Sequence, residues 1–351
     1  MSNSFTTRAG PNSPAGRFRL AARSGFGGYS NQIGLGALLV ALVLLFSALL
    51  GNGFTNSANL LSIGLQLPEL GILSLAIFIT LIHGGMNLSA VATANLCALT
   101  AAHLLTTQIP GASETMQIVW MFIAVFVAVA LGLLVGLLNG AIVVYAGVHP
   151  MLATVGTMIM IKGVALGFTH GAVISGFPAP IRFIGSGMVL GVPFGLIVFA
   201  VCAVAVAVIL NRTPFGAAIY LIGSNERATE YSGVDTKRVL FGIYLLSSFL
   251  AVIAGLVMMG RFNSANATYG DSYILVTVLA SMLGGTDPYG GFGTVSGLVL
   301  SLLILQVIAS AFNQLHLSAF LTIAIWGLLL VGVTAVTVVK RRSRTASEAM
   351  R

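Results

Sequence analysis

The feature that most constrains the fold is a series of long apolar runs that leave little room for charged residues. Between Ser24 and Ile161 the sequence contains no lysine or arginine. Only 7% of the 351 residues are charged and 57% are hydrophobic, whereas a soluble domain carries about 25% charged residues. A soluble fold of this size would lack the polar residues that cover its surface. The composition therefore excludes an ordinary soluble enzyme, a nucleic-acid-binding domain, a coiled coil and a disordered chain, and it predicts a polytopic membrane protein.

Ten stretches meet or approach the roughly 20 apolar residues that a helix needs to cross a bilayer. The predicted spans are Ile33–Leu50, Asn59–Ile82, Leu88–Thr106, Met116–Ala146, Met151–Thr169, Gly195–Leu210, Val239–Gly260, Ser272–Leu283, Val295–Phe312 and Ser318–Val339. Pro68 is expected to interrupt the second span, and the short eighth span favours tilted or re-entrant segments. The predicted fold class is all-α, a polytopic transmembrane helical bundle of about ten spans.

The basic residues cluster at three places, and their placement orients the predicted bundle. Four arginines precede the first run, four basic residues lie in the polar loop 211–238, and five follow the last run, which makes 13 of the 16 Lys and Arg residues. Short loops rich in Lys and Arg stay in the cytoplasm. Ten spans place all three segments on one side, so the N- and C-termini and the loop are predicted to be cytoplasmic. The net charge of +8 then reflects topology, and no nucleic-acid partner is expected.

The expected organisation is one membrane domain between two tails. Residues 1–30, rich in Gly, Ser, Pro and Asn, are predicted to form a flexible cytosolic tail. Residues 31–340 form the transmembrane domain, which includes the cytosolic loop 211–238, and residues 341–351 form a second cytosolic tail. Within the fourth span, glycines recur every fourth residue at Gly132, Gly136 and Gly140, which is typical of a close helix-packing face.

No catalytic or metal-binding motif is recognisable in the sequence. The only lysines, Lys162, Lys237 and Lys340, lack the context of a phosphate-binding P-loop. Apart from five histidines, the ionisable candidates inside the membrane are Glu69, Lys162 and Asp271, each expected near a span end. Proton-driven carriers usually need carboxylates in the bilayer interior, so this scarcity argues against them. Sodium coupling is less well excluded, because backbone carbonyls can bind sodium.

The loop 211–238 contains a predicted short helix of about two turns. Ser224 or Asn225 can cap its N-terminus, with Glu226 in the first turn. Gly233 suits the position just after the helix end. A helix that binds a partner and a solvated loop helix without one are equally compatible with this pattern.

Four ordered blocks resemble the bacterial ABC-transporter permeases of the ribose, xylose and galactose type. The blocks are Gly84–Ser89 (GGMNLS), Leu138–Gly140 with His149–Met151 and Thr154, Ile222–Val234, and Gly284–Gly297. The resemblance covers the chain from about residue 59 to residue 339, in the order and spacing of that family. One departure is Asn87, which stands where the family has an aspartate. It implies altered solute handling, one unequal half of a heterodimer, or a neutral change in a helix break.

The resemblance implies the permease subunit of an ATP-binding-cassette importer that takes up a monosaccharide or related polyol across the bacterial inner membrane. The implied partners are a cytosolic ABC ATPase dimer, a periplasmic solute-binding protein and a second permease subunit, identical or paralogous, within the lipid bilayer. No cofactor is expected on this chain, because ATP and Mg would bind the partner ATPase. The alternative is a secondary transporter or facilitator for a small polar solute that works without an ATPase.

Two sets of candidate site residues follow. The ATPase-coupling set, in the loop helix, is Gly223, Asn225, Glu226, Arg227, Ala228, Glu230 and Gly233. The substrate-pathway set consists of polar groups near helix breaks and two aromatic contacts: Asn87, Ser89, Asn139, Thr154, Thr157, Phe168 and Tyr269. Hydrogen bonding or packing between helices is an equally compatible role for each member of the pathway set. No catalytic residue and no metal ligand are expected.

Overall fold

The computed structural model describes residues 14–111 and 113–349, and it is almost entirely helical. The helices are α1 (Pro14–Leu50), α2 (Asn52–Thr55), α3 (Ser57–Ile82), α4 (Ala90–Gln108), α5 (Glu114–Val144), α6 (Pro150–Thr169), α7 (Ala179–Ser186), α8 (Phe194–Arg212), α9 (Pro214–Tyr231), α10 (Thr236–Phe262), α11 (Tyr273–Leu283), α12 (Val295–Gln314) and α13 (Ala319–Ala349). Two antiparallel pairs of two-residue strands join loops, β1 (Ile174–Ser175) with β4 (Ser264–Ala265), and β2 (Met188–Val189) with β3 (Val192–Pro193).

The predicted all-α membrane bundle is confirmed. Within the described ranges, eight helices are long and apolar enough to cross a membrane, and they correspond to the first seven predicted spans and the ninth. The other two predicted spans correspond to shorter apolar helices, Tyr273–Leu283 and Phe320–Ala335. The predicted flexible tail, residues 1–30, is described only from Pro14, where α1 begins, and residues 1–13 lie outside the described residues.

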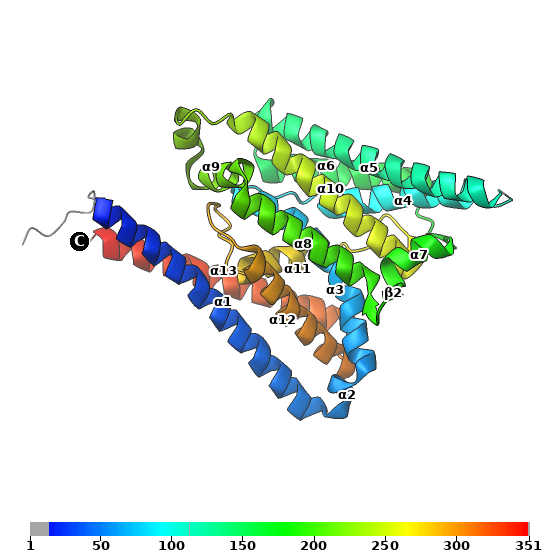
Figure 1. Ribbon diagram of the computed structural model, residues 1–351, viewed down its shortest axis with the longest axis horizontal. Coiled ribbons are helices and arrows are strands. Elements are labelled where there is room, and N and C mark those ends of the chain that lie inside the picture. Colours follow the sequence, from blue (N-terminus) through cyan, green and yellow to red (C-terminus); the bar gives the residue numbers. More distant parts are fainter. Residues whose placement is uncertain (1–13, 112, 350–351) are drawn as a thin grey trace, which may run out of the picture.

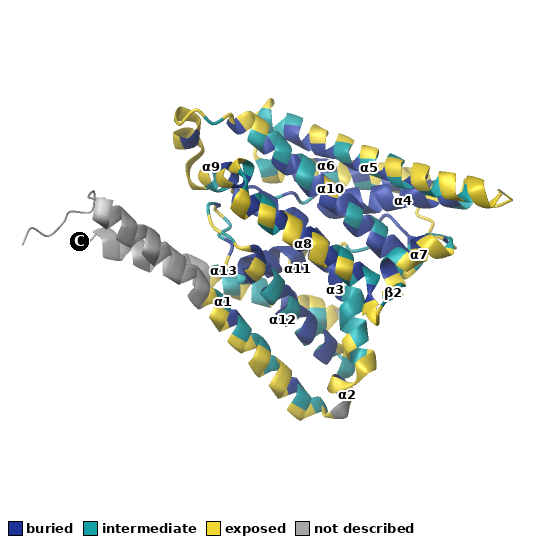
Figure 2. Ribbon diagram, viewed as in Figure 1, coloured by how far each residue is buried: buried dark blue, intermediate teal, exposed yellow. Residues whose placement is uncertain are grey.

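Four helices form the centre of the bundle. The apolar stretch of α3 is 89% buried, that of α4 is 72% buried and those of α10 and α12 are 61% buried, against 6% for α1. Figure 2 shows this difference as the dark blue of α3, α4 and α10 against the yellow outer faces of α1 and α5. The helix α10 packs against α3, α4 and α5, so it joins the inner helices to the outer layer.

One expectation about α3 is wrong. Pro68 lies inside the helix and does not interrupt it. Proline is tolerated in membrane helices, because neighbouring helices satisfy the freed backbone groups. Here Pro68 packs against Gly195 of α8.

The glycine face of α5 packs against α10, as predicted. A Cβ atom added at Gly132 would lie 2.1 Å from Val252, and one added at Gly136 would lie 3.0 Å from Ser248. Gly140 lies against the ring of Phe241 in the same way. The glycines therefore set the close approach of α5 and α10.

The ends of the bundle are distinct. In Figure 1, α9 lies at the left end, whereas α7 and β2 lie at the right end. The segment 263–272 between α10 and α11 is not helical and returns into the bundle before α11 begins. The eleven-residue α11 is therefore a partial span that follows a stretch of turns.

Candidate functional site

A short capped helix forms the last part of α9. Asn225 has an extended backbone conformation (φ −162°, ψ 103°) that divides α9 in two. Its side-chain Oδ1 accepts a hydrogen bond from the Ala228 amide at 3.0 Å, which is an N-cap contact. Gly233 follows the helix with φ +84°, the left-handed conformation that suits glycine. The predicted capped helix is confirmed, and Asn225 rather than Ser224 supplies the cap.

The outer face of this helix is open. Asn225, Glu226, Arg227, Ala228 and Glu230 are exposed. Tyr231 is 92% exposed, whereas Thr229 is buried and donates a hydrogen bond to the Asn225 carbonyl at 2.8 Å. The helix therefore exposes two acidic side chains, one basic side chain and an aromatic ring.

Close glycine packing joins the capped helix to the membrane helices. A Cβ atom added at Gly223 would lie 2.0 Å from the Ile82 carbonyl oxygen and 2.4 Å from the Gly291 amide nitrogen. The Gly291 amide itself donates to the Ile82 carbonyl at 2.7 Å. A Cβ atom added at Gly290 would lie 2.8 Å from the Gly84 nitrogen. We call Gly84, Gly223, Gly290 and Gly291 the glycine joint, since the end of α3, the kink of α9 and the loop before α12 meet there backbone to backbone.

Two side chains border the glycine joint. The Tyr220 hydroxyl, one turn before the kink, donates to the Gly293 carbonyl at 2.8 Å. His83 directly follows α3 and packs edge-on against the Tyr244 ring of α10, with ring centroids 5.9 Å apart. Burial lowers the pKa of His83 to about 4, so this imidazole is neutral at physiological pH. The joint therefore carries no charge that titrates near neutral pH.

Five of the predicted pathway residues form one hydrogen-bonded network next to the joint. Thr157 of α6 donates to Asn139 of α5 at 2.7 Å, and the Asn139 amide donates to Ser89 at 2.8 Å. Ser89 donates to Asn87 at 2.6 Å. Thr154 contacts the same break in the chain, since its hydroxyl donates to the Met86 carbonyl at 2.8 Å. These residues are 0–4% exposed, so the network is closed.

The network also reaches two central helices. The Asn87 side chain donates to Ser247 of α10 at 2.9 Å, and Ser247 donates to the Ala76 carbonyl of α3 at 2.7 Å. The backbone amide of Asn87 donates a hydrogen bond to the Thr80 hydroxyl at 3.0 Å. The short break between α3 and α4 is thus bonded to α3, α5, α6 and α10. Gly84 of the glycine joint lies three residues before Asn87. A movement of the joint would therefore be passed to these four helices.

The other two predicted pathway residues lie away from this network. Phe168 is half-exposed near the end of α6 and packs edge-on against His103, with ring centroids 4.9 Å apart. Tyr269 lies in the segment 263–272, where its ring packs against Phe262 and its hydroxyl hydrogen-bonds Ser264 at 3.0 Å. The closed network therefore includes neither Phe168 nor Tyr269.

Two ion pairs in the membrane-spanning part were missed. Glu69 was expected near a span end, but it lies in the middle of α3, fully buried, and accepts two hydrogen bonds from Arg261 at 2.7 and 2.9 Å. Lys162 pairs with Asp271 at 2.5 Å. Charge complementarity could have suggested these ion pairs, because few charged residues of each sign lie between the two tails. Sequence separation hid the partners, which are 192 and 109 residues apart.

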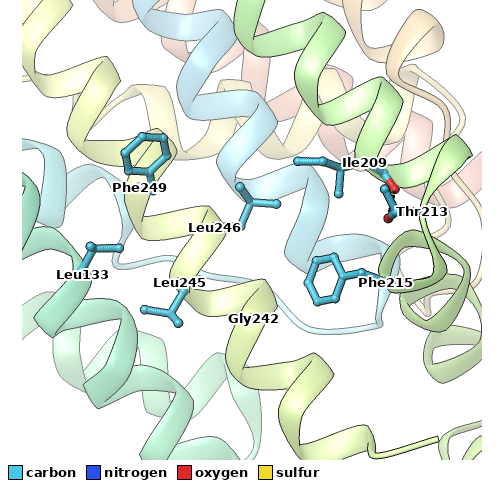
Figure 3. Close-up of a pocket in the computed structure, with 8 residues that line it drawn as sticks. All are labelled: Leu133, Ile209, Thr213, Phe215, Gly242, Leu245, Leu246 and Phe249. Atoms are coloured by element: carbon cyan, nitrogen blue, oxygen red, sulfur yellow. Dashed lines mark hydrogen bonds between the residues drawn. The ribbon is translucent and has the colours of Figure 1, made fainter.

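A cavity of about 490 Å³ lies where α5, α8, the start of α9 and α10 approach one another. Figure 3 shows its lining side chains, among them the ring of Phe215 above Gly242, and Thr213 is the only polar residue among those drawn. An apolar lining does not suit a polar solute. In the described part of the chain, no group of three His, Cys, Asp or Glu side chains could hold a metal ion.

Comparison with known proteins supports a transport role. The family model described as "Branched-chain amino acid transport system / permease component" matches residues 59–338. Among similar proteins, the autoinducer 2 import system permease protein LsrD of Salmonella typhi is 30% identical over 317 residues, 87% of this chain and 90% of the relative. The ribose import permease protein RbsC of Bacillus subtilis (strain 168) is 32% identical over 308 residues, 87% of this chain and 92% of the relative. No solved structure matches the chain. The family membership predicted from four sequence blocks is confirmed.

Proposed function

Because this chain belongs to the family of permease components described for the branched-chain amino acid transport system, we propose that it moves a monosaccharide or related polyol through the inner membrane. The chain is a multi-pass membrane permease of the import type. Its relatives are named for autoinducer 2 import and ribose import. These names favour a small polyhydroxylated solute.

One observation carries the energy-coupling part of this proposal. The capped helix 226–231 has an exposed polar face, and the glycine joint connects it without intervening side chains to the end of α3 and to the loop before α12. We assign this helix as the docking element for a cytosolic ATPase dimer, which binds ATP and Mg in place of this chain. The predicted coupling residues Glu226, Arg227 and Glu230 would face the ATPase. Asn225 and Gly233 would fix the helix ends.

Two further partners complete the proposed importer. A periplasmic solute-binding protein delivers the solute at the end of the bundle opposite α9. A second permease subunit, identical or paralogous, supplies the other half of the pathway. The apolar outer face of α5, with Phe122 and Phe126 more than 70% exposed, suits lipid contact.

The test is ATP-driven uptake by the permease reconstituted in liposomes with its ATPase and binding protein. Labelled ribose serves as the first solute. Deleting 224–232 should abolish ATP-driven uptake without preventing membrane insertion. The matched control is Asp235→Asn, an exposed acidic residue just outside the deleted segment. Full uptake after the deletion would refute the docking role, and uptake by the permease alone without ATP would establish a facilitator instead.

A further inference from the structure

The segment 263–272 places non-helical backbone inside the membrane-spanning part of the bundle. Asn95, in the first half of the membrane helix α4, donates to the carbonyls of Ala267 at 3.1 Å and Tyr269 at 2.8 Å. These contacts hold the turns at 267–269 against α4, about 8 Å from its end at Ala90 and farther from its other end, at 1.5 Å per residue. Irregular backbone at membrane depth is tolerated only where protein buries it or where it lines a water-filled cavity.

The outer side of this segment is polar and accessible. Thr268, Asp271 and Ser272 are exposed, and Asp271 pairs with Lys162 of α6 at 2.5 Å. The side chains of Lys162 and Asp271 are 35% and 45% exposed. Lys162 lies about 18 Å along α6 from Pro150, at 1.5 Å per residue, so it is inside the roughly 30 Å hydrocarbon layer.

Lipid does not fit this surface. An exposed charge near the bilayer centre costs several kcal/mol, so such residues face the protein interior or a water-filled cavity. The neighbouring helix α5 shows what a lipid-facing surface looks like here. Its exposed central side chains include Phe122, Phe126 and Leu134, which are all apolar. On α6 the partly exposed Lys162 lies among apolar residues and contacts Asp271 of the segment 263–272.

We propose that Lys162, Asp271, Thr268 and Ser272 line the water-filled solute pathway and contact the solute as it crosses the membrane. This inference rests on the proposed transport function and locates its pathway. The Asp271 carboxylate would accept hydrogen bonds from solute hydroxyls, and the Lys162 ammonium would donate to solute oxygens. Since the pair has no net charge, the site suits a neutral polyhydroxylated solute rather than an ion. The same region holds Phe168 and Tyr269 near its borders.

Cysteine accessibility tests this location without requiring transport. Cys97 and Cys202 are both buried and are first replaced by alanine. Lys162→Cys is then compared with Phe126→Cys on the apolar face of α5, using a membrane-impermeant maleimide on the reconstituted complex. Apolar surroundings raise a thiol pKa, and one pKa unit lowers the reactive thiolate about tenfold, so the cysteine at 162 should react at least about tenfold faster. If Lys162→Cys does not fold, Thr268→Cys provides the same comparison.

Transport gives the second readout. Asp271→Asn should lower ATP-driven ribose uptake about tenfold or more, because a hydrogen bond to a charged group is lost, while ATP hydrolysis by the complex continues. Equal, slow labelling at positions 162 and 126, or unchanged uptake by Asp271→Asn, would overturn the inference. Failure of the unsubstituted complex to take up any solute with ATP would instead refute the proposed function, which labelling does not test.

Discussion

Two ion pairs are associated with the segment 263–272, one through Arg261 just before it and one through Asp271 within it, and they differ in burial and in the number of contacts. In the pair of Glu69 and Arg261 the carboxylate is fully buried and the arginine side chain is 19% exposed. The contact is bidentate and is completed by the Tyr273 hydroxyl, which donates to Glu69 at 2.6 Å. The pair of Lys162 and Asp271 has a single contact, and both side chains remain more than a third exposed. The first pair joins α3, α10 and α11 into one unit, whereas the second leaves charged atoms free for another molecule.

The comparison separates structural polar groups from groups available to a solute. A polar group that is buried and fully bonded has no capacity left for a ligand, as in the network around Asn87. A polar group that is exposed at membrane depth requires water or another molecule beside it. The closed network and the buried pair therefore fix the helices, and the exposed pair marks the pathway.

The largest expected effect comes from breaking the buried pair. Glu69→Gln leaves the Arg261 charge without its partner, which costs about 3–5 kcal/mol for a buried pair. We expect a large drop in the thermal unfolding temperature in detergent and little folded protein in the membrane. Lys162→Met is the matched control, since it removes one partner of the exposed pair. Equal destabilisation by both variants would remove the distinction between the two pairs.

A smaller effect is expected at the glycine joint. Gly223→Ala places a methyl group where the Ile82 carbonyl and the Gly291 amide already lie, and overpacking of this kind costs about 1–3 kcal/mol. The unfolding temperature should fall, and uptake should fall further than the amount of folded protein does. Gly332→Ala on α13 is the control, because no atom lies within 4 Å of the added methyl group. Normal uptake by Gly223→Ala would show that the joint does not transmit movement.

The closed network should show a moderate effect on stability. Asn139→Ala removes the acceptor of Thr157 and the donor to Ser89, and hydrogen bonds between membrane helices contribute about 0.6–2 kcal/mol. We expect a lower unfolding temperature, with uptake reduced in proportion to folded protein. Thermal unfolding and uptake measured on the same preparation check this. A loss of uptake at unchanged stability would mean that Asn139 contacts the solute, as the sequence alone allowed.

The smallest expected effect on stability belongs to the exposed pair. Asp271→Asn should change the unfolding free energy by about 0–1 kcal/mol, the usual contribution of exposed ion pairs. Thermal unfolding in detergent checks this value. A strong destabilisation would show that the pair of Lys162 and Asp271 stabilises the fold, as the pair of Glu69 and Arg261 does.

Features that depend on neighbouring residues were predictable from the sequence. The apolar runs gave the helices, and the cap at Asn225 and the helix end at Gly233 followed from residues a few positions apart. The break near Asn87 was also visible, because Gly84 and Gly85 precede it. Hydrogen bonding between helices was one of the two roles open to the polar residues near helix breaks, although their gathering around Asn87 was not predicted.

Features that join distant segments were not predictable. The glycine joint combines residues near 84, 223 and 290, and nothing in the local sequence states that they meet. The ion pairs depend on partners more than 100 residues apart. Pro68 was expected to break a span, but it lies inside α3, where neighbouring helices can satisfy the freed backbone groups. In each case tertiary packing determined the result.

The most direct test of the account is the reactivity of a cysteine at position 231, in the exposed part of the capped helix. Tyr231→Cys, in a chain with Cys97 and Cys202 replaced, is treated with a bulky maleimide in the permease alone and in its complex with the ATPase. The account predicts rapid modification of the permease alone and loss of most of that reactivity in the complex, because an interface excludes the reagent. Equal reactivity with and without the ATPase would contradict the assignment of this helix as the docking element.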